Sequence, residues 1–174
     1  SEMVLETLNL VKDSVDFSQY DWNGDSIVDQ VFLLYAGYGE AQYAPEWTIW
    51  PCEGKLSNFA GMTSLPQYNG MTINTFACSC ELHSNKGSQL DGIGTICHEF
   101  SHCMGLPDFY NTSDMTDFCM DAFELMDQGA YNGNSYSPAA YTGYERWVCG
   151  WREPVELRDT CTITGWLPLV SGGE

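Results

Sequence analysis

Residues 98 to 108 read His-Glu-Phe-Ser-His-Cys-Met-Gly-Leu-Pro-Asp, and they restrict the possible folds of this chain more than any other segment. On a helix, His98 and His102 lie one turn apart on the same face, where both imidazoles can bind one ion. The carboxylate of Glu99 can then reach a water on the same metal without coordinating the metal itself. This spacing predicts a helix that carries a zinc site, with Glu99 as the general base.

A catalytic zinc ion needs a third protein ligand and one open position for water. Gly105 can turn the chain left-handed after the second histidine, and Pro107 prevents the helix from resuming. This turn would return Asp108 towards the ion, and a carboxylate oxygen is an acceptable zinc ligand. A glutamate from a later helix is the competing third ligand, and Glu145 is the candidate. The early helix stop favours Asp108.

The remaining periodicities predict an α+β fold. An apolar stripe indicates a helix over 2–12, and the β-branched run at 28–37 indicates a strand buried on both faces. We expect a long irregular loop over 40–70, which is rich in proline and glycine, and then a strand over 71–82. Ser137, as the N-cap before a proline, and Gly150, as the stop, predict a helix over 138–149.

Composition limits the partners and the cellular location. Six Lys and Arg against 24 Asp and Glu give a formal charge of −18, which would repel nucleic acid and anionic lipid. Neither a membrane-spanning apolar stretch nor an export signal is present, so we expect no membrane insertion and infer that any signal was removed or left out. The eight cysteines are compatible with disulfides in an extracellular protein, and free buried thiols remain the alternative.

The acidic segment 21–29 resembles the start of a calcium-binding loop. Asp21, Asn23, Asp25 and Asp29 stand at positions 1, 3, 5 and 9 of such a loop. Its sixth position is Ser26 instead of glycine, and a strand follows where a helix should. A calcium site of another kind and a turn whose carboxylates cap backbone amides are both open.

Three motifs together resemble the immune inhibitor A family of secreted bacterial zinc metallopeptidases. They are HExxHxxGLPDxY at 98–110, LMDQGAYNG at 125–133 and PxxYxxYERWxxGW at 138–151. The resemblance implies a metzincin-like α+β fold, with a twisted mixed sheet, an active-site helix and a second helical or irregular subdomain. It also implies Asp108 as the third zinc ligand and Met126 as the residue of a turn beneath the metal. We expect one catalytic domain over 1–174, divided at about residue 105.

The resulting functional hypothesis is a secreted endopeptidase that cleaves protein substrates with a metal-activated water. Tyr110 and Tyr131 are candidate donors to the oxyanion, and His83 is expected on a loop or at the surface. By analogy with metzincins, substrate would pair with an edge strand near 71–82, and we expect a monomer. The alternative is an inactive zinc- or calcium-binding domain of a cell-surface protein. The intact Glu99 argues against that alternative.

Overall fold

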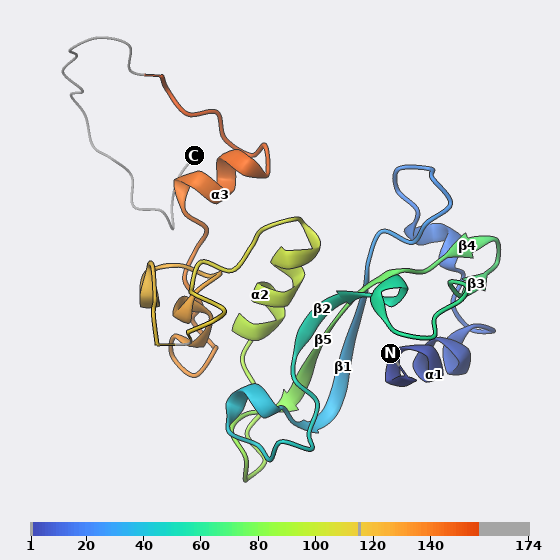
Figure 1. Ribbon diagram of the computed structural model, residues 1–174, viewed down its shortest axis with the longest axis horizontal. Helices are drawn as coiled ribbons and strands as arrows, with labels where there is room; N and C mark the ends of the chain where they lie inside the picture. The colour runs from blue at the N-terminus through green and yellow to red at the C-terminus, as the bar shows by residue number, and fades with distance from the viewer. Residues whose placement is uncertain (1, 115, 157–174) are drawn as a thin grey trace.

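A computed structural model describes residues 2–114 and 116–156. The chain is a mixed α/β structure in which helix α1 (Glu2–Val11) and the strands form one part, and the segments that follow helix α2 (Gly94–Cys103) form another (Figure 1). Helix α2 lies between these two parts. Among the described residues, no helix is long and apolar enough to cross a membrane.

A three-stranded mixed sheet positions helix α2. Strand β5 (Thr75–Leu82) lies in its centre, parallel to β1 (Val31–Tyr38) and antiparallel to β2 (Cys52–Lys55). The prediction that the strand within 71–82 lies at the edge of the sheet is therefore wrong, because β5 lies between β1 and β2. It is also shorter than expected, since Met71–Thr72 forms a separate strand, β4, which pairs with β3 (Gln67–Tyr68).

The true edge beside helix α2 is β2, which lies within the region expected to be an irregular loop. Its four residues, Cys-Glu-Gly-Lys, lack the alternation of β-branched residues that identifies strands, so the pattern concealed it. Strand β1 also departs from the expectation of burial on both faces, because Leu33 is 8% exposed and Leu34 is 60% exposed. Helix α2 packs on β5 and β2, so the Leu34 side of β1 is left open.

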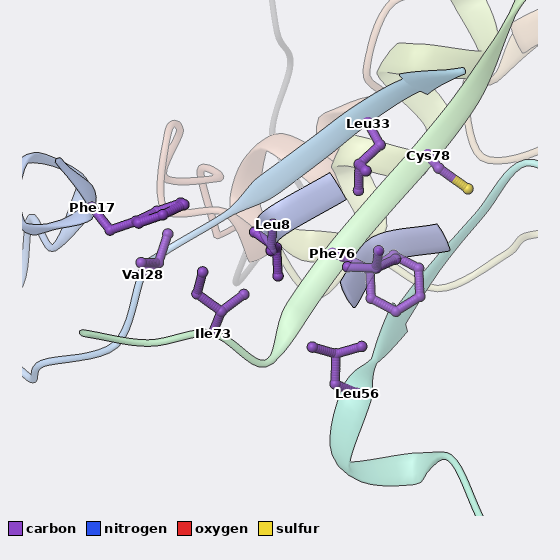
Figure 2. Close-up of a cluster of buried hydrophobic side chains, with 9 residues drawn as sticks. Leu8, Phe17, Val28, Leu33, Leu56, Ile73, Phe76 and Cys78 are labelled. Carbon is purple, nitrogen blue, oxygen red and sulfur yellow. The ribbon is translucent and has the colours of Figure 1, made fainter. Parts of the chain in front are cut away.

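The main core lies on the other face of the sheet, under helix α1. The expected helix over 2–12 is confirmed, and its apolar stripe buries Val4 and Leu8. Figure 2 shows how Leu8 from this helix meets Val28, Ile73 and Phe76 from the strands and their flanking segments. This packing covers one face of β5, which leads into the loop before α2.

Helix α3 (Gly143–Val148) begins later than the expected 138–149. Thr142 is the N-cap, and its side chain and that of Glu145 form a reciprocal capping box. This cap replaces the one expected at Ser137. The stop at Gly150 agrees with its left-handed φ of 72°. The eighth cysteine, Cys161, lies outside the described residues.

A second, smaller core contains Leu106, Leu125, Met126 and Ala130. Helix α2 contacts this region closely where it begins, because a Cβ on Gly94 would lie 1.8 Å from the carbonyl oxygen of Ala130. Glycine at this position therefore allows the helix to approach the segment that carries Met126.

Candidate metal centre

Helix α2 presents both histidines of the motif on one face, and backbone carbonyls fix their ring orientation. The Nδ1 atom of His98 lies 3.0 Å from the carbonyl oxygen of Leu125, and that of His102 lies 2.8 Å from the carbonyl oxygen of Leu106. A carbonyl oxygen only accepts, so each Nδ1 carries the hydrogen. The Nε2 lone pair of each ring is consequently free to bind a metal.

The turn after α2 places a carboxylate opposite these two nitrogens. Gly105 has a φ of 92°, in the left-handed region that glycine adopts without strain. Asp108 Oδ1 lies 3.2 Å from His98 Nε2 and 3.3 Å from His102 Nε2, and the two Nε2 atoms are 3.2 Å apart. The three atoms form a nearly equilateral triangle.

This triangle has the dimensions of three ligands on one tetrahedral zinc ion. Two ligand atoms at about 2.1 Å from such an ion lie about 3.4 Å apart. The Asp108 Oδ1 atom is buried without a hydrogen-bond partner, as expected for an atom that binds a metal. Among the described residues, these three form the only group of three or more His, Cys, Asp or Glu side chains close enough to share an ion.

Electrostatics also favours a cation in this triangle. Burial lowers the pKa of His102, but the neighbouring Asp108 carboxylate and the Leu106 carbonyl outweigh that effect and raise the pKa to about 8. Burial likewise opposes ionisation of Asp108, yet the two histidines hold its pKa well below the usual value. The group therefore attracts positive charge, which a divalent metal can supply.

Glu99 lies beside the triangle, with only 7% of the residue exposed. Burial raises the pKa of its carboxyl group, while His98 and His102 act in the opposite direction. It lines two adjoining cavities of about 390 and 610 Å³. A carboxylate that is desolvated and faces an open cavity is suited to take up and release a proton.

The two cavities together form the cleft over the candidate metal centre. The larger one is bounded by Trp50, Cys52 and Glu53 at the start of the edge strand β2, and by the metal-binding triangle. Tyr110 lines both cavities, and Tyr131 lines the smaller one. The structure therefore brings both predicted tyrosines close to Glu99.

Comparison with known proteins agrees with this geometry. Residues 7–150 match the family described as immune inhibitor A peptidase M6, catalytic domain. The chain belongs to this family. A curated relative, immune inhibitor A of Bacillus thuringiensis subsp. alesti, is 26% identical over 168 residues, which cover 81% of this chain and 23% of the relative. The chain thus spans about a quarter of that relative's length.

Within this peptidase M6 domain, Glu145 lies outside the group of three, in agreement with the preference for Asp108, and His83 lies on the loop after β5, as expected. Glu145 is fully buried in the capping box of α3, where its Oε2 accepts from the Thr142 backbone N–H, so the group of three at the metal centre contains Asp108 instead. His83 also lines the smaller cavity with Glu99, and its Nδ1 lies 3.0 Å from a carboxylate oxygen of Asp91.

Sequence reasoning missed His83, Trp50 and Tyr43 as cleft residues of this domain. None of them belongs to a recognisable motif, and two of them come from the segment expected to be an irregular loop. Met126 is fully buried next to Leu125, whose carbonyl orients His98, and the Met126 carbonyl accepts from the Phe109 backbone N–H. It therefore lies in the segment that supports the metal centre.

The acidic loop at 21–29 gives the calcium expectation no support. The Asp21 carboxylate accepts backbone hydrogen bonds from Gly24, Asp25 and Ser26 at 2.8 to 3.0 Å. Asp25 accepts from Ile27, Asn23 from Asp25, and Asp29 from Trp22. The side-chain oxygens cap amides within the loop, which is the turn that the sequence left open as the alternative.

The seven cysteines among the described residues carry free thiols. Three of them lie on the sheet: Cys52 is half-buried on β2, while Cys78 and Cys80 are buried on β5. Cys97 and Cys103 belong to helix α2, and Cys119 is exposed. In the described part of the chain, these thiols therefore correspond to the free-thiol alternative that the sequence left open.

Proposed function

We propose that this chain is a zinc-dependent endopeptidase that hydrolyses protein substrates. The observation that carries the proposal is the triangle of His98 Nε2, His102 Nε2 and Asp108 Oδ1, with sides of 3.2 to 3.3 Å, next to the buried Glu99. Membership in a peptidase family supports the reaction class. We also propose that the chain is secreted, a location with which the bacterial origin of the relative is consistent.

A zinc ion held by these three ligands would act as a Lewis acid on a water molecule and on the scissile carbonyl. Glu99 would accept the proton of that water and then transfer it to the leaving amine. The raised pKa of its carboxyl group suits both steps, because a strongly acidic carboxylate would be a poor base and would return the proton poorly.

Tyr110 and Tyr131 would donate a hydrogen bond to the oxygen that becomes negative during the attack. Burial raises the pKa of both phenols, to about 12 for Tyr131, so both stay protonated at neutral pH. Both tyrosines line the cavity that contains Glu99 and His98, but Tyr110 also interacts with the proposed ligand Asp108, so Tyr131 is the better-supported donor. A donor placed in this way stabilises the transition state.

An extended substrate would pair with strand β2 instead of the strand at 75–82. Strand β2 pairs with β5 on one side only, and Trp50 to Glu53 border the cavity that contains the metal-binding triangle. A free strand edge offers backbone donors and acceptors to a peptide. We further propose that the metzincin-like arrangement applies, with Met126 as the floor below the metal and with both subdomains in one catalytic domain.

The test is zinc content measured by elemental analysis, together with cleavage of casein with and without a chelator. We expect one zinc per chain, and cleavage that stops when the metal is removed and returns when zinc is restored. Glu99→Gln should retain zinc and lose roughly 100- to 10,000-fold in kcat, while the exposed control Glu6→Gln should behave as the parent. Zinc-free protein with full activity, or an active Glu99→Gln variant, would refute the proposal. Zinc without cleavage in the parent chain would instead favour the inactive binding domain.

A further inference from the structure

Two cysteines face each other across the strand pair that forms the wall of the cleft. Cys52 on β2 is the direct register partner of Cys78 on β5, and their sulfur atoms lie 3.9 Å apart. Figure 2 shows the Cys78 sulfur pointing from β5 towards β2.

We propose that Cys52 and Cys78 form a disulfide when the chain is oxidised, and that this bond fastens the edge strand of the cleft to the centre of the sheet. Residues directly opposite each other in an antiparallel pair have Cα atoms about 4.5 to 5.5 Å apart. A disulfide accepts Cα separations of roughly 4.4 to 6.8 Å. The bond therefore requires rotation of two side chains and no change in strand register.

The other cysteines of the sheet and helix have different surroundings. The Cys80 sulfur lies 4.0 Å from a carboxylate oxygen of Asp91, and the Cys103 sulfur contacts the Glu99 carbonyl oxygen at 3.4 Å. Each of these sulfurs contacts an oxygen acceptor instead of a second sulfur. The Cys78 sulfur also lies 3.9 Å from the Trp50 carbonyl oxygen, but among Cys52, Cys80 and Cys103 it is Cys52 whose sulfur contacts it.

A low-molecular-weight disulfide such as oxidised glutathione is a sufficient oxidant. The half-buried Cys52 is the thiol that such a molecule can reach, and attack by its thiolate releases one reduced glutathione and leaves a mixed disulfide. The Cys78 thiolate then attacks the Cys52 sulfur and releases the second glutathione. Two protein thiols are oxidised, and one glutathione disulfide is reduced to two thiols.

A disulfide between Cys52 and Cys78 would affect the cleft because of where the two residues lie. Strand β2 is only four residues long, and its pairing with β5 is its only ladder in the described sheet. Cys52 and its neighbours Trp50 and Glu53 line the cavity that contains the metal-binding triangle. A covalent link at Cys52 would restrict movement of this wall, whether or not the chain is a peptidase.

Tryptic digestion distinguishes this pair from its neighbours. Cleavage after Lys12, Lys55 and Lys86 yields peptide 13–55, which contains Cys52 only, and peptide 56–86, which contains Cys78 and Cys80. After oxidation with glutathione disulfide and alkylation of the remaining thiols, we expect the two peptides to be joined, with a mass two hydrogen atoms below their sum. The joined species should disappear in Cys52→Ser and in Cys78→Ser and persist in the matched control Cys80→Ser.

Hydrogen exchange and thermal unfolding report the structural effect without any measurement of activity. We expect slower amide exchange over 50–55 in the oxidised chain, and a midpoint about 5 to 10 °C above that of the reduced chain. A joined peptide that survives in Cys78→Ser but not in Cys80→Ser would overturn the pairing, as would alkylation of both thiols after oxidation. Unchanged exchange in the joined chain would overturn the fastening of the cleft wall.

Discussion

Replacing Glu124 with glutamine should remove a large part of the pH dependence of stability. Glu124 and Glu145 are both fully buried, and three of their four side-chain oxygens have no hydrogen-bond partner. Burial and the neighbouring Glu145 carboxyl group raise the pKa of Glu124 from 4.5 to about 8. At pH values between 4.5 and about 8, the folded chain therefore keeps a proton on this pair of carboxyl groups, whereas the unfolded chain has lost it.

The sign of the effect follows from this difference in bound protons. Between the two pKa values, the folded state binds one proton more than the unfolded state, so the free energy of unfolding falls as the pH rises. The fall is about 1.4 kcal/mol for each pH unit, and the full interval from 4.5 to about 8 corresponds to about 5 kcal/mol. Below this interval both states are protonated, and the stabilisation is complete.

The assay compares urea unfolding of the parent and of Glu124→Gln at about pH 5 and about pH 7, with metal content held constant. Glutamine is neutral at both pH values. From pH 5 to pH 7, the free energy of unfolding of the variant should therefore rise by about 3 kcal/mol relative to that of the parent. Titration of the metal centre occurs in both proteins and cancels in the difference. For the exposed control Glu6→Gln, the difference from the parent in free energy of unfolding should be the same at both pH values. A constant difference for Glu124→Gln as well would refute the shared proton.

Three other changes test the candidate metal centre. Asp108→Asn should weaken zinc binding by roughly 100-fold or more, measured by competition with a chromophoric chelator, while the exposed Asp117→Asn should not. Gly105→Ala should destabilise the chain by about 1 kcal/mol through backbone strain. It should also weaken zinc binding about tenfold, because this turn carries the Leu106 carbonyl that orients His102. The control Gly87→Ala, at a similar φ of 89° and also with no atom near the added Cβ, should lower stability by a similar amount and leave zinc binding unchanged. Tyr131→Phe should lower kcat about 100-fold with unchanged zinc content, and an unaltered kcat would exclude its hydroxyl as the oxyanion donor.

The parts that sequence predicts well are those with a strict local spacing. The one-turn separation of His98 and His102 requires only that the segment be helical, and the stop at Gly105 requires only a left-handed residue. Both requirements are local, so no knowledge of the fold is needed. The apolar stripe that buries Val4 and Leu8 was predictable for the same reason.

The parts that failed depend on contacts between distant segments. Strand β2 forms because its backbone hydrogen-bonds to β5. Its four residues include a glycine and are too few to show the alternation that would predict a strand. The start of α3 depended on a choice between two possible caps, and the reciprocal bonds of Thr142 and Glu145 prevailed over Ser137. His83 became a cleft residue only because the loop after β5 folds back beside Asp91.

The geometry of the candidate centre combines both kinds of information. The helix determines which side-chain atoms can converge, but the ring orientation of each histidine depends on a backbone carbonyl, one inside the motif and one far from it in the sequence. For His102 that carbonyl belongs to Leu106, immediately after the glycine turn. For His98 it belongs to Leu125, which lies between the buried Glu124 and Met126. Displacement of the 124–126 segment would therefore rotate one ligand and leave the other in place, so loss of packing there should weaken metal binding without unfolding helix α2.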